Sequence, residues 1–325
     1  SSDVCSSDLP AVSVPLNDDY SINEPEFRAY LRWIKTFYGK GMDGLVCNGH
    51  TGEITGLTRA ERKRVVEICA EECGDVMTII SGVNCENTAE SIEMAKEAKE
   101  AGADGILLMP PHMWLRFGMN PDAPFEYVKD VAEGADIDII IHLYPATSKA
   151  FYPVETLIKM CKEIDHVKCI KMGTRVTSIY EHDVRLLRQE CPDISLITCH
   201  DETLCVSWFP GMDGALIGFA GCVPEIICPA REVFANPDKH TLKEAQDWSD
   251  RIYHISQAIY GGGQPSGEAH ARLKEALKQR GIFKSALMRK PVLPLNDEEK
   301  AWVALGLERS QLPEVDMTQI GRAHV

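Results

Sequence analysis

Val167-Lys168-Cys169-Ile170-Lys171-Met172-Gly173 is an apolar run with a lysine near its end and a glycine that closes it. Short β-rich runs that end at glycine are typical of buried strands. Alternate residues of a strand share a face, so Cys169 and Lys171 point to one side and Ile170 to the other. An ammonium group that faces a protein interior is costly unless it is paired or loses its proton. The stretch therefore predicts a buried strand that carries an unusual lysine.

The lysine of this strand has two interpretations. Desolvation lowers the pKa of a lysine, because the charged form loses its hydration. A neutral amine is the nucleophile that forms a Schiff base with a carbonyl compound. A lysine at a strand end is equally typical of a salt bridge, so Lys171 alone does not decide between chemistry and structure.

The composition is that of a globular protein with a large core. The chain has 325 residues, of which 44% are hydrophobic and 26% charged. The net charge of -15 argues against nucleic acid or an anionic membrane as a partner. No apolar stretch is long enough to cross a bilayer. The 12 cysteines form no CxxC pair and no finger spacing, so we expect reduced thiols and a cytoplasmic location.

Both ends of the sequence look foreign to the rest. Residues 3–9 and 319–325 can be encoded by reverse-complementary DNA, as an adapter translated at both ends of a sequencing read would give. We therefore expect residues 1–9 and 319–325 to be non-native. Cys5 and His324 carry no functional weight for this reason.

A recurring motif divides the chain into units. Gly41-Met42-Asp43-Gly44, Gly102-Ala103-Asp104-Gly105 and Gly211-Met212-Asp213-Gly214 each precede an apolar run. Each is typical of a helix stop that leads into a buried strand. The other expected strands are 10–16, 76–83, 137–144, 167–172 and 195–199, and helices are expected at 87–101, 153–163 and 175–190.

Eight strands alternate with helices over residues 10–238. Strands that are apolar on both faces are covered on both sides, which is typical of a parallel sheet. Eight βα units predict a closed (β/α)8 TIM barrel of the α/β class, with an open doubly wound sheet as the alternative. Residues 239–312 predict a C-terminal helical appendage, and the glycine-rich run 261–267 predicts a loop within it. The helices of this appendage are expected at 241–260, 267–279 and 297–306.

Polar residues gather where the predicted strands end, which is where barrel chemistry takes place. Gly49, His50 and Thr51 follow the second strand, and this glycine-rich turn leaves backbone N–H groups open for a carboxylate. The later strands end in His112, His142, Tyr144, Lys171, His200, Asp201 and Glu202. Histidines from four strand ends beside a lysine favour a functional site over packing.

Five other histidines lie on helix or loop stretches, and we expect them to be solvated or structural. They are His166, His182, His240, His254 and His270.

These motifs resemble those of one family. Gly49-His50-Thr51-Gly52-Glu53 resembles its G-T-T-G-E motif, Gly102-Ala103-Asp104-Gly105 precedes a strand that ends in proline, and Ile170-Lys171 resembles its Schiff-base segment. Pro291 to Leu295, followed by an acidic helix start, resembles its ending. From Pro10 to about Leu312 the chain is similar to the dihydrodipicolinate synthase/N-acetylneuraminate lyase class I aldolases.

The resemblance implies a site and an assembly. Lys171 would form an imine with a 2-oxo acid, usually pyruvate. His50 and Thr51 would hold its carboxylate through backbone N–H groups, with Gly49 and Gly218 as further substrate contacts. The family implies no cofactor and no bound metal, and it suggests a homotetramer built as a dimer of dimers.

The proton relay is the main departure from the family. His142, His50 and His112 stand where the family has a strand-five tyrosine, a threonine and a tyrosine after strand four. Tyr144 shares a face with His142, so either could be the acid/base. Burial would lower the pKa of an imidazole, and a carboxylate partner such as Glu53 would raise it.

The substrate-contacting positions also differ. Thr147 stands where the synthase branch has the arginine that grips its aldehyde, which argues against lysine biosynthesis. Asp201 and Glu202 resemble the pair that contacts the polyol tail in the sialic acid lyase branch, or else they form an acidic helix start favoured by the helix dipole. Arg175 is close enough to Lys171 in sequence to meet a second carboxylate.

We therefore expect a lyase that uses Lys171 as a Schiff base, most directly a retro-aldolase that releases pyruvate from a hydroxylated or sugar-derived 2-oxo acid. A Schiff-base dehydratase of a 2-keto-3-deoxy sugar acid is the nearest alternative, since the same enamine can expel a β-hydroxyl. A metal-dependent lyase or hydrolase would draw its ligands from the strand-end histidines, although no HxH or HxxxH spacing supports it. A non-catalytic sugar-acid sensor would have no need of Lys171.

Overall fold

The computed structural model describes residues 7–261 and 266–320. Its strands are β1 (Asp8–Pro10), β2 (Gly44–Cys47), β3 (Thr78–Val83), β4 (Gly105–Leu108), β5 (Asp138–Leu143), β6 (Val167–Met172), β7 (Ser195–Thr198) and β8 (Gly214–Ile217). The α-helices of the barrel are α1 (Glu24–Lys35), α2 (Arg59–Cys73), α3 (Thr88–Ala101), α4 (Met113–Phe117), α5 (Ala123–Ala135), α6 (Val154–Glu163), α7 (Thr177–Glu190), α8 (Leu204–Trp208) and α9 (Pro224–Ala235). Then follow α10 (Leu242–Tyr260), α11 (Gly267–Gln279) and α12 (Asp297–Arg309).

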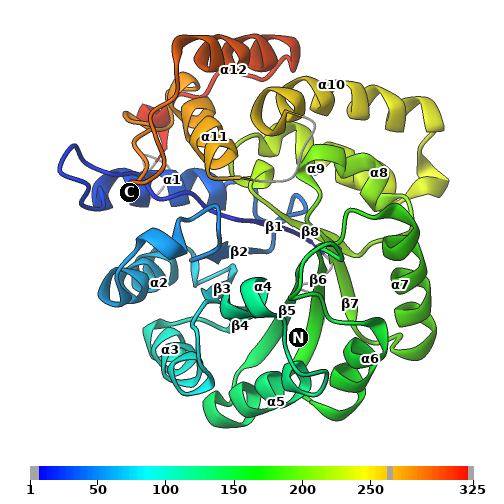
Figure 1. Cartoon of the computed structure of the whole chain (residues 1–325). Coiled ribbons are helices and arrows are strands. Elements are labelled where there is room, and N and C mark those ends of the chain that lie inside the picture. The colour runs from blue at the N-terminus through cyan, green and yellow to red at the C-terminus, as the bar shows by residue number, and fades with distance from the viewer. Residues whose placement is uncertain (1–6, 262–265, 321–325) are drawn as a thin grey trace.

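The strands form one parallel barrel. Their order is β1-β8-β7-β6-β5-β4-β3-β2, and a parallel bridge between Ala11 and Val46 joins β1 to β2. The N–H of Val12 donates to the carbonyl of Val46 at 3.0 Å across the same seam. Helices surround the strands (Figure 1). The predicted (β/α)8 TIM barrel is confirmed, and the open doubly wound sheet is wrong.

The predicted alternation of strands and helices agrees with the structure, and 167–172 and 267–279 have the expected bounds. The Thr58 side chain caps α2 and forms the reciprocal capping box with Glu61. The first strand differs, because β1 begins at Asp8 and ends at Pro10 rather than running over 10–16. Most of the glycine-rich run 261–267, namely 262–265, lies outside the described residues, as do Cys5 and His324.

Asp8 and Leu9, which the sequence marks as foreign, pair with Ala215 and Leu216 of β8. Strand pairing uses backbone groups, so it does not depend on which residues stand there. The Asp8 side chain is fully buried, and its Oδ1 lies 3.7 Å from Arg231 Nε. Burial raises the pKa of Asp8 to about 7, although the charge of Arg231 acts in the opposite direction. The non-native origin of residues 1–9 stays a prediction.

The ladder between β5 and β6 has one irregularity. Its register shifts between Ile139 and Ile140, and the pairing passes over Lys168 of β6. Beyond the shift, His142 and Lys171 are direct register partners. Partners in a sheet point to the same face, so both side chains face the interior at the carboxyl end of the barrel.

The C-terminal helices lie together on one side of the barrel, next to α1 and α9 (Figure 1). α10 packs on α9, and α12 packs on α10. No helix among the described residues is long and apolar enough to span a membrane. The cysteines of the described ranges are free thiols, and most of them are buried.

An ion pair inside the protein joins α11 to the loop after β2. Lys274 Nζ lies 2.6 Å from Glu53 Oε2 and 2.8 Å from the carbonyl oxygen of Leu287. The other carboxylate oxygen, Oε1, accepts the N–H of Arg289 at 3.0 Å. Lys274 is 1% exposed and Glu53 8% exposed. Charges attract strongly where water is excluded, so this contact holds α11 against the barrel.

We predict that Lys274→Met lowers the free energy of unfolding by about 3–5 kcal/mol, because it leaves the Glu53 carboxylate buried without its cation. Denaturant unfolding followed by circular dichroism measures the change. The matched control is Lys243→Met, which removes an exposed ion pair with Asp247 and should leave the stability nearly unchanged. Equal stability of the two variants would contradict this role.

Candidate active site

The carboxyl ends of the strands surround a cavity of about 170 Å³ beside Lys171. The sequence-predicted residues that line it are Gly49, His50, Thr51, His142, Tyr144, Lys171, Asp201 and Gly218. Residues that lie far apart in the sequence, from the loop after β2 to the loop after β8, therefore meet at one place.

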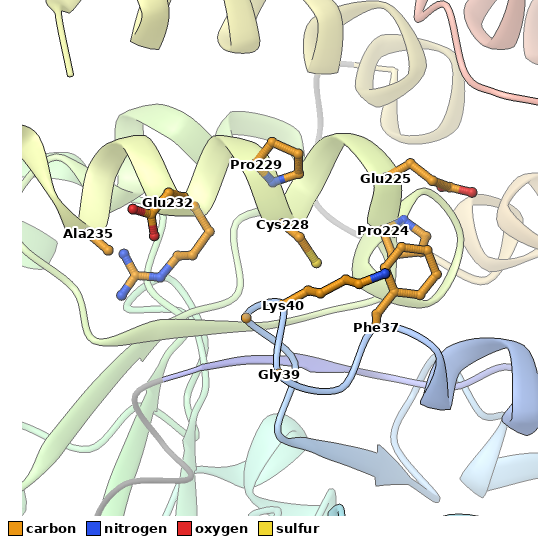
Figure 2. A pocket seen from close by; sticks show the side chains of 11 residues that line it. Phe37, Gly39, Lys40, Pro224, Glu225, Cys228, Pro229, Glu232 and Ala235 are labelled. Atoms are coloured by element: carbon orange, nitrogen blue, oxygen red, sulfur yellow. The ribbon is translucent and has the colours of Figure 1, made fainter. Parts of the chain in front are cut away.

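A larger cavity of about 610 Å³ lies elsewhere, between the turn after α1 and helix α9 (Figure 2). Figure 2 shows the Lys40 side chain lying toward Phe37 and Pro224 in this cavity. The residues that line it include none of the predicted site residues. Size alone therefore does not identify the site, whereas the convergence of titratable groups does.

Lys171 is partly exposed to the cavity, and its neighbours in the sheet are His142 of β5 and Ile197 of β7. Burial lowers its pKa, an effect that Cys199 and Asp201 partly offset. Within residues 7–261 and 266–320 it forms no ion pair, so the salt-bridge interpretation has no partner there. A lysine in this setting has an increased share of neutral, nucleophilic amine at neutral pH.

Tyr144 is the centre of a hydrogen-bonded group. Its hydroxyl lies 3.0 Å from His112 Nε2 and 3.2 Å from His50 Nε2. His112 Nε2 is also 3.1 Å from Asn84 Nδ2. Burial raises the pKa of Tyr144, so the phenol keeps its proton at neutral pH. One phenol and two imidazoles thus form a connected path for a proton.

His142 lies edge-on to Tyr144, with 4.9 Å between ring centroids and 74° between ring planes. Its Nδ1 has no hydrogen-bond partner among the described residues. Burial, followed by the charge of Lys171, lowers the pKa of His142 well below its ordinary value and that of His50 to about 3. Burial prevails because Glu53, the carboxylate that could have raised these values, is bound to Lys274 instead.

The turn after β2 offers backbone donors to the cavity. The N–H groups of His50 and Thr51 have no acceptor within the described parts of the chain. Gly218 faces this turn: a Cβ at Gly218 would lie 3.0 Å from Leu273 Cδ2 and 3.2 Å from Thr51 Oγ1. A larger residue at position 218 would push α11 and this turn apart.

Asp201 and Glu202 have different surroundings. The Asp201 carboxylate lines the cavity and accepts the N–H of Phe219 at 3.0 Å and the O–H of Tyr260 at 2.8 Å. Burial raises its pKa to about 6. Glu202 does not line the cavity, and its Oε1 accepts from Arg175 Nε at 2.7 Å.

Arg175 reaches the cavity but is already engaged. Apart from Glu202, its nitrogens donate to the carbonyls of Gly173 at 2.8 Å and Cys199 at 3.1 Å. A guanidinium has only five N–H donors, so these bonds hold it in place and leave little for a ligand.

Besides Glu202, two predicted site residues lie away from the cavity lining. Thr147 is exposed on the loop after β5, and His112 contacts the site through its bond to Tyr144 and through its ring, whose centroid lies 6.2 Å from that of His50. His200 also departs from the prediction that it belongs to the rim of histidines beside Lys171. Its ring packs on Tyr180 at 4.8 Å and lines a separate cavity of about 300 Å³. The reason is alternation, since the residues before and after His200 face Lys171 and therefore turn it away.

Two residues from the C-terminal helices line the cavity without having been predicted. His270 of α11 was expected to be solvated or structural, and the structure corrects that expectation. Tyr260 ends α10 beside Asp201. The helical pattern puts His270 on the same face as Lys274, one turn away. The available signal in the sequence was Lys274, a lysine at a core position of α11, which indicates that this face of the helix meets a charged group of the barrel.

The strand-end histidines do not form a metal site. Among the described residues there is no group of three or more histidine, cysteine, aspartate or glutamate side chains that could hold a metal ion. The metal-dependent alternative has no ligand set in this geometry.

A (β/α)8 barrel with a lysine of lowered pKa at a strand end, beside backbone donors and a group of hydrogen-bonded rings, has the features of a Schiff-base lyase. The chain belongs to the dihydrodipicolinate synthetase family, whose sequence model matches residues 5–309. Members of this family are lyases, and so is this chain.

Known relatives match nearly the whole chain. A 4-hydroxy-tetrahydrodipicolinate synthase of Bartonella bacilliformis is 26% identical over 306 residues, which are 94% of this chain and 97% of that protein. Among solved structures, YagE of E. coli in complex with pyruvate has a TM-score of 0.84 at 20% identity and covers 94% of this chain and 99% of its own. Dihydrodipicolinate synthase from Aquifex aeolicus has a TM-score of 0.83 at 19% identity, with coverage of 95% and 99%.

We predict that the rings of His50 and His142 show no protonation step between about pH 5 and pH 8, because burial lowers both pKa values below that window. Ring nitrogen NMR of histidine-labelled protein measures this, with His50→Gln and His142→Gln to assign the signals. A midpoint near the ordinary value of about 6.5 for either ring would contradict the burial argument.

Proposed function

We propose that the chain is a Schiff-base lyase that cleaves a hydroxylated, sugar-derived 2-oxo acid and releases pyruvate. The observation that carries the proposal is Lys171, a desolvated lysine without an ion pair among the described residues, which faces a cavity beside unoccupied backbone donors.

The chemistry begins at the amine of Lys171. Its neutral form adds to the C2 carbonyl of the 2-oxo acid, and loss of water gives a protonated imine. A base then takes the proton of the C4 hydroxyl, and the C3–C4 bond breaks with its electron pair flowing into the imine. The resulting enamine is protonated at C3, and water releases pyruvate and restores Lys171. The aldehyde half of the substrate leaves separately.

The backbone N–H groups of His50 and Thr51 hold the carboxylate of the substrate in this proposal. Two converging N–H groups form a small anion site, and a charged acceptor strengthens each hydrogen bond. The complex of YagE with pyruvate supports a 2-oxo acid as the ligand, because that protein has the same fold.

The acid/base of the proposal is Tyr144. Its hydroxyl is bonded to both His112 and His50, whereas Nδ1 of His142 has no partner in the described chain. The phenol takes the proton of the C4 hydroxyl as it passes its own proton to the imidazole of His50, and the same path returns a proton to C3 of the enamine. The low pKa of His50 keeps its ring neutral before the reaction and favours return of the proton. His142 then supports the Tyr144 ring by edge-on packing.

The substrate tail is uncharged and hydroxylated in this proposal. Arg175 is engaged by Glu202 and by backbone carbonyls, so a second carboxylate would find no free cation there. Asp201 and Tyr260 offer hydrogen-bonding groups suited to hydroxyls. A Schiff-base dehydratase remains the second candidate, since loss of a β-hydroxyl from the same enamine needs the same lysine and the same acid.

We also infer that the chain assembles with copies of itself, as a dimer of dimers. Phe117 of α4 is 73% exposed, and Phe209, just after α8, is 70% exposed. Large apolar side chains exposed in this way are typical of surfaces that are covered in an assembly.

The lysine is tested by reductive trapping. Incubation with pyruvate and borohydride should add one reduced adduct on the peptide that contains Lys171, as located by mass spectrometry. Lys171→Arg should abolish the adduct, since a guanidinium stays protonated, while the circular dichroism spectrum is retained. An adduct on another lysine would overturn the assignment. Analysis of products from 2-keto-3-deoxy sugar acids separates pyruvate release from loss of water.

The relay is tested by two substitutions on β5 and the loop after it. Tyr144→Phe should lower kcat by roughly 10²–10⁴-fold, because the phenol proton is lost, and it should spare the trapped imine. His142→Gln should be the milder change and serves as its matched comparison. A severe His142→Gln with an active Tyr144→Phe would assign the acid/base role to the imidazole.

A further inference from the structure

His270 is a titratable group of the cavity that the proposed mechanism does not use. It lies in the first turns of α11 and is partly exposed where it lines the cavity. Neither ring nitrogen has a hydrogen-bond partner among the described residues. Burial, followed by the charge of Lys171, lowers its pKa to about 4. The ring is therefore neutral at neutral pH and carries one N–H donor without an acceptor.

The position of this ring is fixed by the rest of α11. Lys274 lies one helical turn after His270 on the same face and is bound to Glu53, which ends the turn that starts at Gly49. Leu273 and Thr51 both lie beside Gly218. The helix can neither rotate nor slide without breaking the buried ion pair, so His270 has a defined place above the turn after β2.

His270 lies on the side of the cavity that the turn after β2 forms. Both His270 and His50 line the cavity. Leu273, three residues after His270, lies beside Gly218, and Thr51 lies beside the same glycine. The N–H of His270 is therefore available on the side where the backbone donors of His50 and Thr51 lie.

We propose that His270 is a substrate-binding residue whose ring N–H donates a hydrogen bond to the carboxylate of the bound 2-oxo acid, beside the backbone N–H groups of His50 and Thr51. The inference rests on the proposed function, since it takes the ligand to be a 2-oxo acid. It gives the C-terminal appendage a direct part in binding: α11 supplies one donor, and the Lys274–Glu53 pair aligns it. A carboxylate held on two sides orients the C2 carbonyl toward Lys171.

The test compares pyruvate with pyruvamide, which has the same shape but lacks the carboxylate charge. The half-saturating concentration of each is measured by borohydride trapping on Lys171. His270→Phe keeps an aromatic ring without the N–H, so it should raise the value for pyruvate about tenfold or more and raise that for pyruvamide much less, because a neutral amide oxygen accepts a weaker hydrogen bond than a carboxylate. His270→Asn or His270→Gln, which retain an amide N–H, should recover part of the loss for pyruvate.

His254→Gln on α10 is the matched control, because that histidine lines a different cavity, and it should match the unsubstituted chain. Equal weakening for both ligands would mean that His270 only braces the site, and unchanged binding of pyruvate would mean that it makes no contact. Either result overturns the inference while the trapped imine still supports the proposed function. Calorimetric titration of pyruvate into Lys171→Arg protein, with and without His270→Phe, makes the same comparison without an imine. A chain that binds pyruvate there but traps none on Lys171 would refute the proposed function separately.

Discussion

The buried ion pair between Lys274 and Glu53 is the contact on which the arrangement of the site depends. A carboxylate and an ammonium removed from water are stable only together, so the turn after β2 and helix α11 must stay in register with each other. Glu53 sits in a left-handed backbone conformation with a φ of 60°, which directs its side chain away from the histidines and toward α11. The turn that begins at Gly49 is thereby held at its start by β2 and at its end by the ion pair with α11.

This arrangement also decides the electrostatics of the cavity. Because Glu53 and Glu202 are taken up by Lys274 and Arg175, neither is left to charge an imidazole. Burial and the charge of Lys171 then outweigh the opposing charge of Glu268 beside His270, and the rings of His50, His142 and His270 are all held neutral. Lys171 is therefore surrounded by neutral rings, and its lowered pKa comes first from burial, with a smaller contribution from the charge of Arg175.

The sequence predicted the barrel because its strands, its helices and the turns between them each have a local sequence pattern. The strands are apolar on both faces, the helices follow a period near 3.6, and Gly-x-Asp-Gly marks several entries into strands. The positions of Lys171, His142 and Tyr144 followed from alternation along a strand. His200 was misplaced although alternation along β7 turns it away from the face that Cys199 shares with Lys171. His270 was misplaced for a different reason, because its place in the cavity depends on where α11 docks. That docking is a contact between distant segments, and neither periodicity nor spacing encodes it. The same holds for Glu202, whose partner Arg175 lies 27 residues away.

Lys168, the residue of β6 that the ladder passes over, shifts the pairing of β6 with β5 by one residue. Had the ladder continued without it, Lys171 would stand opposite Leu143, and the amine would share its face with an aliphatic side chain instead of an imidazole. The set of side chains that face the cavity from this strand end, which can be called its reading frame, is therefore fixed by one bulge between the site and the start of β6. Substitutions at Lys168 preserve that frame, whereas the loss or gain of a single residue there would exchange the inner and outer faces of one strand end. Relatives that differ in length at this point would carry a different set of side chains into the cavity, whatever motifs they share.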